Sequence, residues 1–191
     1  MRAATCSHGG PEFPMLRVGT SQLAKYYGFP CGGGAVLADT KSVDVQLGME
    51  KMGTGLLPAL AGCNMCTGMG LFADENAISL ETLIIDWEVT GWIERVLRGI
   101  NVTKDTCDLA IFKEVGPGGD FVRSKHTFDN YKTESFLPKI MDRGYLAIEK
   151  DPLAKSMRKR AKAMYPKLMQ NYKAPAVSEE TVKKLDQIIE R

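Results

Sequence analysis

The residues best suited to chemistry lie in the segment 114–143, between two stretches predicted to be ordered. The segment contains the loop Gly116–Gly119 (Gly-Pro-Gly-Gly) and His126, one of only two histidines in this chain of 191 residues. Arg123 and Asp129 flank the histidine, so it is placed either to anchor a substrate carboxylate or to brace the loop. Binding and catalytic groups concentrate on loops carried by a rigid scaffold, and the glycines let this loop open and close as a lid.

A second group of candidate residues follows two runs of small and apolar residues. The runs are predicted to be buried strands and cover residues 31–38 and 63–72. Asp39 comes at the end of the first strand. Phe72 is the last residue of the second, and Asp74 and Glu75 follow it. The carboxyl ends of parallel barrel strands carry the active site, so these residues are site candidates. Alternatively, Asp39 only supports the start of a helix, and the other three form a solvated loop with one core aromatic.

Helices are predicted around these strands from apolar spacing and capping residues. They cover residues 15–27, 42–60, 80–97, 131–142 and 151–171, with a last helix after Ser178. Ser79 and Gly99 mark the start and end of the clearest one. The run Leu109–Phe112 fits a third strand or a short helix. This alternation predicts an α/β fold with a parallel sheet, with too few units for a closed eight-stranded barrel of about 250 residues.

Composition and charge exclude several classes of protein. The chain is 44% hydrophobic and 25% charged, as in an ordinary globular protein. Its formal net charge is only +2, and its basic residues are not concentrated on one element except near 155–162, which argues against binding to nucleic acid. Without an apolar run of 18 residues or a signal pattern, we expect neither a membrane span nor secretion. The five cysteines are then expected to be reduced thiols in the cytoplasm.

Two further sets of residues are weaker candidates. Cys63 and Cys66 have the spacing of half a zinc or redox site, but residues three apart on a strand face opposite sides and no second pair matches them, so no metal is predicted. Asp86 and Glu88 project about 100° to each side of the helix residue between them, so they cannot converge. They are expected to be polar flanks of an outer helix.

The segment 114–143 also resembles the C-terminal region of the trimethylamine and quaternary-amine:corrinoid methyltransferases. In that family a Gly-Pro-Gly-Gly loop leads to a His-Thr pair, here His126-Thr127, then to a Glu, a Pro and an Asp-Arg pair. Further blocks in the family's order are 26–30, 32–34 leading to Asp39 and Lys41, Asp44 with Gln46, 61–64 and 83–88. The resemblance implies that residues 1–145 are the C-terminal part of a TIM-type (β/α)8 barrel and that residues 146–191 are a helical extension.

The resemblance implies an activity as well. A methyl group moves from a quaternary or tertiary amine, of the glycine betaine or trimethylamine type, to the cobalt of a corrinoid carried by a cognate corrinoid protein. Members that act on trimethylamine use pyrrolysine, which is absent from this sequence, so the chain is closer to the pyrrolysine-free relatives associated with glycine betaine. It has Cys66-Thr67 and Asn130 where many relatives have histidines, which leaves the amine open.

Such a reaction needs a site that holds a cation, excludes water and aligns the methyl group. Aromatic faces and carboxylates are the partners expected for a quaternary ammonium. The residues expected in the site are Asp39, Glu75 and His126 as catalytic groups, Thr67, Phe72, Asp74 and Arg123 as substrate contacts, and Gly118 and Gly119 on the cofactor side.

Two other functions stay open. In the first, the chain is a non-catalytic fragment of such an enzyme and acts only as a folding or association unit. Half-barrels expose sheet edges that must be paired, so we expect a homo-oligomer. A third interpretation is an unrelated α/β enzyme that uses Cys31 or Cys66 as a nucleophile together with His126.

Overall fold

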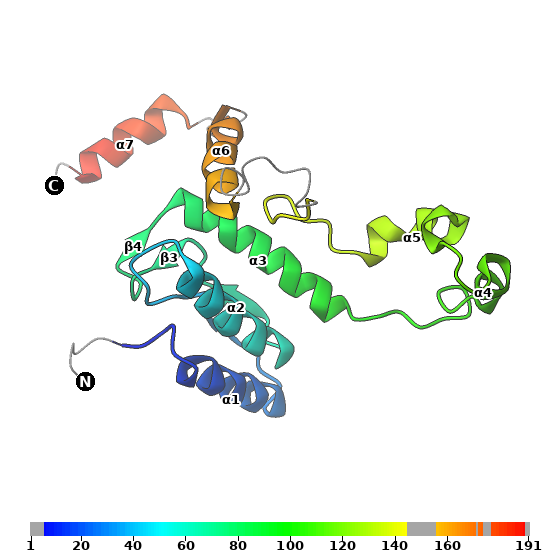
Figure 1. Ribbon diagram of the computed structural model, residues 1–191. Helices are drawn as coiled ribbons and strands as arrows, with labels where there is room; N and C mark the ends of the chain where they lie inside the picture. The colour runs from blue at the N-terminus through cyan, green and yellow to red at the C-terminus, as the bar shows by residue number, and fades with distance from the viewer. Residues whose placement is uncertain (1–5, 145–155, 171, 174–176, 190–191) are drawn as a thin grey trace.

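A computed structural model of the chain describes residues 6–144, 156–170, 172–173 and 177–189. Helices predominate in these residues and the strands are short (Figure 1). The helices are α1 (Glu12–Tyr26), α2 (Val45–Leu60), α3 (Leu80–Arg98), α4 (Leu109–Val115), α5 (Lys125–Glu134), α6 (Met157–Gln170) and α7 (Glu179–Ile189), with a 3₁₀ turn, η1 (Phe121–Arg123). The strands are β1 (Gly32–Gly34), β2 (Met65–Thr67), β3 (Leu71–Phe72) and β4 (Ala77–Ile78). None of the described helices is both long and apolar enough to span a membrane.

Strands β1 and β2 pair in parallel, as the sequence predicts. Gly32 lies opposite Met65 and Gly34 opposite Thr67, with α2 as the crossover between the strands. The parallel pair is shorter than expected, and the described residues form no closed barrel. The α/β class is therefore confirmed only in this reduced form, and part of a TIM-type barrel is not confirmed. The predicted boundary at residues 145 and 146 lies outside the described residues.

The second predicted strand divides in two, which corrects the expectation of one continuous run over 63–72. Gly68 and Gly70 have φ angles of 108° and 86°, a region that glycine enters at little steric cost. The chain turns there, and β3 then pairs with β4 in an antiparallel hairpin, with Phe72 opposite Ala77. Phe72 therefore lies at the end of a hairpin strand and not of a parallel strand.

In the segment 99–143 the structure decides one open alternative and corrects one prediction. The run Leu109–Phe112, expected as a strand or a short helix, lies in helix α4, whose N-terminus the Asp108 side chain caps by accepting from the Ala110 amide at 2.9 Å. The helix predicted over 131–142 begins earlier, at Lys125, and ends at Glu134. Figure 1 shows α4 and α5 projecting beyond the C-terminal end of α3, away from the strands. We call residues 100–134 the arm.

The core forms where α2 and α3 pack together and α6 covers α3. Its buried apolar side chains include Leu47, Ile84, Ile85, Val89, Ile93, Ile140 and Ala161. Glu88 is buried and its Oε1 accepts the amides of Lys139, Ile140 and Met141 at 2.8–3.0 Å. These bonds explain why the chain after α5 is not helical. They also correct the expectation that Glu88 is a polar flank.

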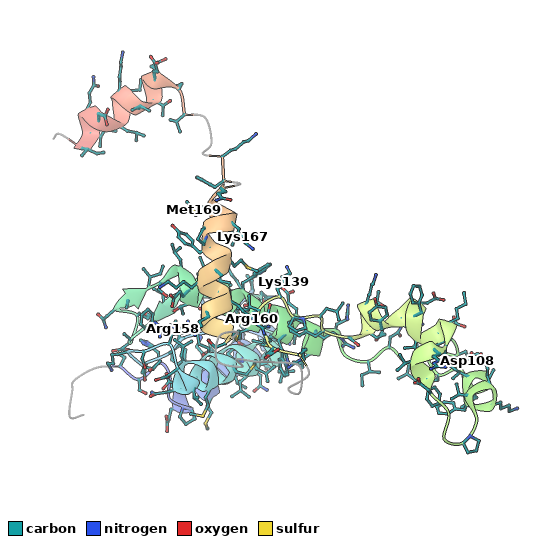
Figure 2. The ribbon with its side chains drawn as sticks, turned by 45° about the horizontal axis from the view of Figure 1, so that its top comes forward. Asp108, Lys139, Arg158, Arg160, Lys167 and Met169 are labelled. Carbon is teal, nitrogen blue, oxygen red and sulfur yellow. The ribbon has the colours of Figure 1, made fainter. Side chains whose placement is uncertain are left out.

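Helix α6 is fixed at its base by two arginines (Figure 2). Arg158 lies 3.1 Å from Glu81 at the start of α3, and Arg160 donates to the Met141 carbonyl at 3.1 Å. Lys139 lies over the Trp87 ring, with its Nζ 3.7 Å from the ring centroid. Charged groups therefore attach α6 and the segment around 140 to α3.

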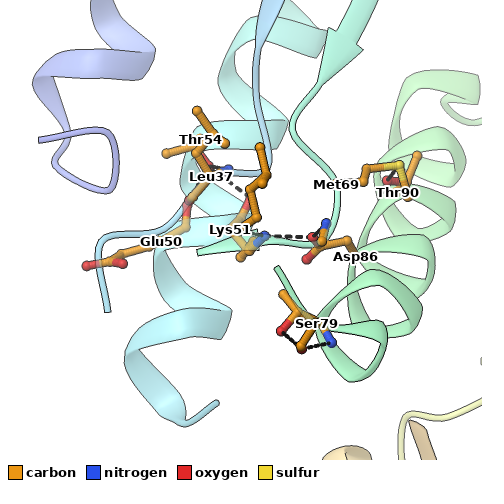
Figure 3. A network of polar contacts seen from close by, with 11 residues as sticks. Leu37, Glu50, Lys51, Thr54, Met69, Ser79, Asp86 and Thr90 are labelled. Atoms are coloured by element: carbon orange, nitrogen blue, oxygen red, sulfur yellow. Dashed lines mark hydrogen bonds and ion pairs between the residues drawn. The ribbon is translucent and has the colours of Figure 1, made fainter. Parts of the chain in front are cut away.

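Lys51 and Asp86 form a fully buried ion pair between α2 and α3 (Figure 3). The Lys51 Nζ lies 2.6 Å from the Asp86 Oδ2 and 2.5 Å from the Leu71 carbonyl oxygen, and the Gly70 amide donates to the same Oδ2 at 2.6 Å. The pair therefore ties both helices to β3, and Asp86 is not the polar flank that was expected. Burial raises the pKa of Asp86 to about 6 and lowers the pKa of Lys51.

Replacing Lys51 leaves the Asp86 carboxylate buried without its cation. We expect Lys51→Met to lower the free energy of unfolding by about 3–5 kcal/mol, the usual cost of removing one partner of a buried pair. Urea unfolding measures the loss. Lys113→Met, at an exposed lysine of α4, is the matched control and should change stability by less than about 0.5 kcal/mol. Equal effects of the two substitutions would contradict the role of the pair.

The raised pKa of Asp86 makes stability depend on pH. The folded protein holds the Asp86 proton up to about pH 6, whereas the unfolded chain releases it near 3.8. The free energy of unfolding should therefore fall as pH rises from about 4 to about 6, by up to about 3 kcal/mol from this group. Unfolding of the wild type and Asp86→Asn across this range measures the difference. A difference that stays constant with pH would contradict the shift.

Candidate functional site

The loops that follow β1 and β3 lie side by side, which brings Asp39 and Asp74 together. The Ala73 amide donates to the Thr40 carbonyl at 2.9 Å, and the Asp74 amide donates to the Ala38 carbonyl at 3.2 Å. Two of the predicted site carboxylates thus converge from separate strands. The two carboxylates lie near each other because backbone hydrogen bonds join their loops, and not because the two side chains contact each other directly.

His8 joins these carboxylates from a third segment, ahead of α1. Its Nδ1 lies 2.8 Å from the Asp74 Oδ1, and its backbone amide donates to the Asp39 Oδ1 at 2.9 Å. The Ser7 hydroxyl donates to the other Asp39 oxygen at 2.9 Å. The ring of Phe13 meets the His8 ring edge-on, with the centroids 5.0 Å apart. We call His8, Asp39 and Asp74 the loop cluster.

Sequence reasoning missed His8 because residues 1–14 show no pattern of a regular element. One signal was available. His8 is the other of the chain's two histidines, and it lies ahead of the helix predicted over 15–27, as Asp39 lies ahead of the helix predicted over 42–60. Loops that precede the helices of a barrel lie at the face that carries the site, so this position alone could have placed His8 with Asp39.

The backbone after β3 adopts an uncommon conformation. Ala73, Asp74 and Glu75 have φ angles of 52°, 56° and 63°. A non-glycine residue in this region costs on the order of 1–3 kcal/mol and such residues cluster at functional sites. Asn76 offsets part of the cost, since its side-chain amide donates to the carbonyls of Ala73 and Asp74 at 3.1 and 2.8 Å. The turn therefore holds Asp74 toward His8.

Glu50 of α2 holds the backbone of the loop that carries Asp39. Its Oε2 accepts the backbone amides of Asp39 at 2.8 Å and Thr40 at 3.2 Å. In the described residues neither Asp39 nor Asp74 has an ion pair with a lysine or arginine. The cluster thus collects negative charge from two carboxylates, with His8 as the neighbouring ionisable base.

The remaining predicted residues on this side of the molecule lie close to the cluster in the chain. Phe72 is half-buried and packs partly against the core, and Glu75 is exposed at the tip of the hairpin. Thr67 is exposed at the carboxyl end of β2, where it lies opposite Gly34. The hairpin thus places an aromatic ring and two carboxylates within four consecutive residues.

The structure places the other predicted residues on the arm. The Nε2 of His126, in α5, lies 3.1 Å from the Asp105 carbonyl oxygen, and Arg123 ends η1 with its side chain exposed. Gly118 and Gly119 lie in the turn between α4 and η1. His126 also lines a pocket of about 280 Å³ with Asp108, Ile111, Glu114, Ser124, Lys125 and Asp129. The structure therefore divides the predicted site into a group around the strands and a group on the arm (Figure 1).

The cysteines do not form the nucleophile site of the third interpretation. The buried Cys31 Sγ lies 3.6 Å from the Ser21 hydroxyl, and no described contact joins it to His126. Burial, followed by the neighbouring Cys63, raises the pKa of the Cys66 thiol. A raised pKa disfavours the thiolate, which is the reactive form.

The whole chain matches one family. Residues 1–191 match the family model of trimethylamine methyltransferase (MTTB). The chain belongs to this family. It is 34% identical to the glycine betaine methyltransferase of Desulfitobacterium hafniense (strain Y51), over 99% of the chain and 40% of that protein. It is 30% identical to the trimethylamine methyltransferase MttB of Desulfitobacterium hafniense (strain DSM 10664 / DCB-2), over 100% of the chain and 38% of that protein.

A further relative is the trimethylamine methyltransferase MttB2 of Methanosarcina mazei, at 28% identity over 100% of the chain and 38% of that protein. The chain thus spans about 40% of the length of these curated relatives. The resemblance found in the sequence is confirmed by these matches.

Gly9 tests whether the packing around the loop cluster is required. A Cβ at Gly9 would lie 2.6 Å from the Glu50 Cδ and 2.9 Å from the Asp39 amide nitrogen. We expect Gly9→Ala to cost about 1–3 kcal/mol, as overpacking does. Gly19 of α1 has open space around it, so Gly19→Ala should instead stabilise the protein by about 0.5–1 kcal/mol. Thermal unfolding compares the two, and a shift of the same sign in both would contradict the packing described.

Proposed function

We propose that this chain forms part of a methyltransferase that moves a methyl group from a quaternary or tertiary methylated amine to a corrinoid carried by a partner protein. The observation that carries the proposal is the convergence of the loops that hold Asp39 and Asp74, with Phe72 two residues before Asp74 in the chain. Neither carboxylate has a lysine or arginine partner in the described residues. This arrangement suits a cation that carries methyl groups. Membership of the methyltransferase family supports the same function.

The hairpin residues would hold the amine. Phe72 offers an aromatic face, and a quaternary ammonium over such a face is stabilised by about 0.5–2 kcal/mol. Asp74 and Glu75 add negative charge next to it. When the methyl group leaves, the electron pair of the broken C–N bond stays on nitrogen, which loses its positive charge if the amine was quaternary. The carboxylates then attract the product less than the substrate, which favours its release.

The arm would face the partner. When bound there, the corrinoid of the partner would supply a cobalt(I) nucleophile for the methyl group. Gly116 and Gly118 have φ angles of 68° and 74° with open space around them, so the loop between α4 and η1 can approach a large planar group without side chains in the way. Arg123 and His126 follow this loop and present a cation and a hydrogen-bonding ring. We propose Gly118, Gly119, Arg123 and His126 as contacts on the corrinoid side and Asp39, Thr67, Phe72, Asp74 and Glu75 as the amine side.

Amine binding tests the proposed substrate side. We expect the chain to bind glycine betaine or tetramethylammonium, measured by ligand-observed NMR, and Phe72→Ala to weaken binding about 2–30-fold through loss of the cation–π contact. Phe29→Ala is the matched control, since Phe29 is exposed after α1. No binding of any methylated amine, or equal effects of both substitutions, would contradict the assignment.

Methyl transfer tests the function itself. With a cognate corrinoid protein in its cobalt(I) form and an amine substrate, we expect methylcobalt formation by absorption spectroscopy, and a loss of at least tenfold in rate for Glu75→Gln. Glu94→Gln, at an exposed carboxylate on α3, should leave the rate unchanged. Amine binding without any methyl transfer would favour the interpretation as a non-catalytic unit.

Self-association is proposed separately from activity. In the described residues β1 and β2 pair only with each other, so each strand has an outer edge without a partner strand. At the edge of β1, Arg17 donates to the Gly32 carbonyl at 2.8 Å. Such edges pair readily with other chains. Light scattering on the purified chain would show a dimer or larger assembly if this proposal holds, and a monomer if it does not.

A further inference from the structure

The loop cluster has the ligand types and spacing of a metal site. One ligand atom each from His8, Asp39 and Asp74 lies within 4.8 Å of the others. The three residues come from separate segments: His8 lies ahead of α1, Asp39 after β1 and Asp74 after β3. Asp39 is 31 residues from His8 in the sequence and Asp74 is 66 residues from it. We infer that His8, Asp39 and Asp74 bind one divalent cation of the first transition row.

The spacing fits a shared ion after small movements of side chains. Nitrogen and oxygen ligands lie about 2.0–2.2 Å from such a metal, so two ligands of one ion are at most about 4.4 Å apart. The His8 Nδ1 and the Asp74 Oδ1 are already 2.8 Å apart. A ligand oxygen of Asp39 lies within 4.8 Å of both atoms, and its carboxylate has to turn toward them to complete the set.

The charges also favour a cation. Two carboxylates lie near one another and neither has a lysine or arginine partner in the described residues. Imidazole with carboxylate oxygen suits manganese, iron, cobalt or zinc. A divalent ion would neutralise both carboxylates and would replace the hydrogen bond between His8 and Asp74. With the ion bound, Glu75, which is not a ligand, would supply the negative charge on the proposed amine side.

Surrounding groups hold two of the three ligands, Asp39 and His8, in place, as is usual for metal ligands. The Ser7 hydroxyl and the His8 amide donate to Asp39, and Glu50 holds the Asp39 backbone. The edge-on ring of Phe13 fixes the plane of His8. Three protein ligands leave further coordination positions open for water or for an oxygen of a bound molecule.

This inference does not depend on methyl transfer, and its test uses metal alone. Titration of the chain with Mn²⁺, followed by the loss of the free-ion EPR signal, should show one bound ion per chain. Pulsed EPR should show coupling to a histidine nitrogen. The assay needs neither amine nor corrinoid, so failure of the proposed function does not alter its result.

Variants locate the ion. His8→Ala should abolish the nitrogen coupling and weaken Mn²⁺ binding at least tenfold, and Asp39→Asn should weaken it similarly. His126→Ala is the matched control, because it removes the chain's other histidine, and it should retain binding and coupling. If His8→Ala fails to fold, Ser7→Ala takes its place. It removes only the hydrogen bond from Ser7 to the Asp39 carboxylate, so it should weaken Mn²⁺ binding less than His8→Ala does. Absence of stoichiometric binding, or nitrogen coupling that is lost in His126→Ala but kept in His8→Ala, would overturn the inference.

Discussion

The parallel alignment of β1 and β2 is the constraint on which the site depends. Parallel strands end at the same edge of a sheet, so the chain leaves β1 toward Asp39 and leaves β2 toward the hairpin that carries Asp74. The amides of residues 73 and 74 donate to the carbonyls of residues 40 and 38, and these bonds hold the loop after β1 against the loop after β3. Only three residue pairs form the ladder itself, so this geometry relies on the elements packed around it.

The buried ion pair is the main support of that geometry. Lys51 and Asp86 contact the backbone of Gly70 and Leu71, immediately before Phe72. Burying two charges costs several kcal/mol of desolvation per ion, and the attraction between them repays this only with good hydrogen bonding. An apolar pair would fill the same space but would leave the Leu71 carbonyl and the Gly70 amide without these partners. We interpret the pair as a device that fixes where the hairpin begins.

Sequence patterns predicted the elements whose signals are local. The start of α3 at Ser79 and its end at Gly99 follow from capping chemistry, and the order of β1, α2 and β2 follows from apolar spacing. The start of α5 was missed although Ser124 caps it locally by accepting from the Thr127 amide. The non-helical chain around residue 140 and the hairpin at Leu71 were missed because they depend on Glu88 and Asp86, polar residues whose burial the sequence does not reveal. Asp39 and Asp74 were recognised from their strand ends. His8 was not, because only long-range contacts place it.

A double-mutant cycle between His8 and Asp74 tests the convergence of these loops most directly. The free energies of unfolding of His8→Ala, Asp74→Ala and the double variant are measured by urea denaturation, without added metal. Residues in direct contact couple by about 0.5–3 kcal/mol, whereas distant residues are additive within about 0.3–0.5 kcal/mol. We predict a coupling above about 0.5 kcal/mol. Additive effects would contradict the arrangement of the three loops from which the site is built.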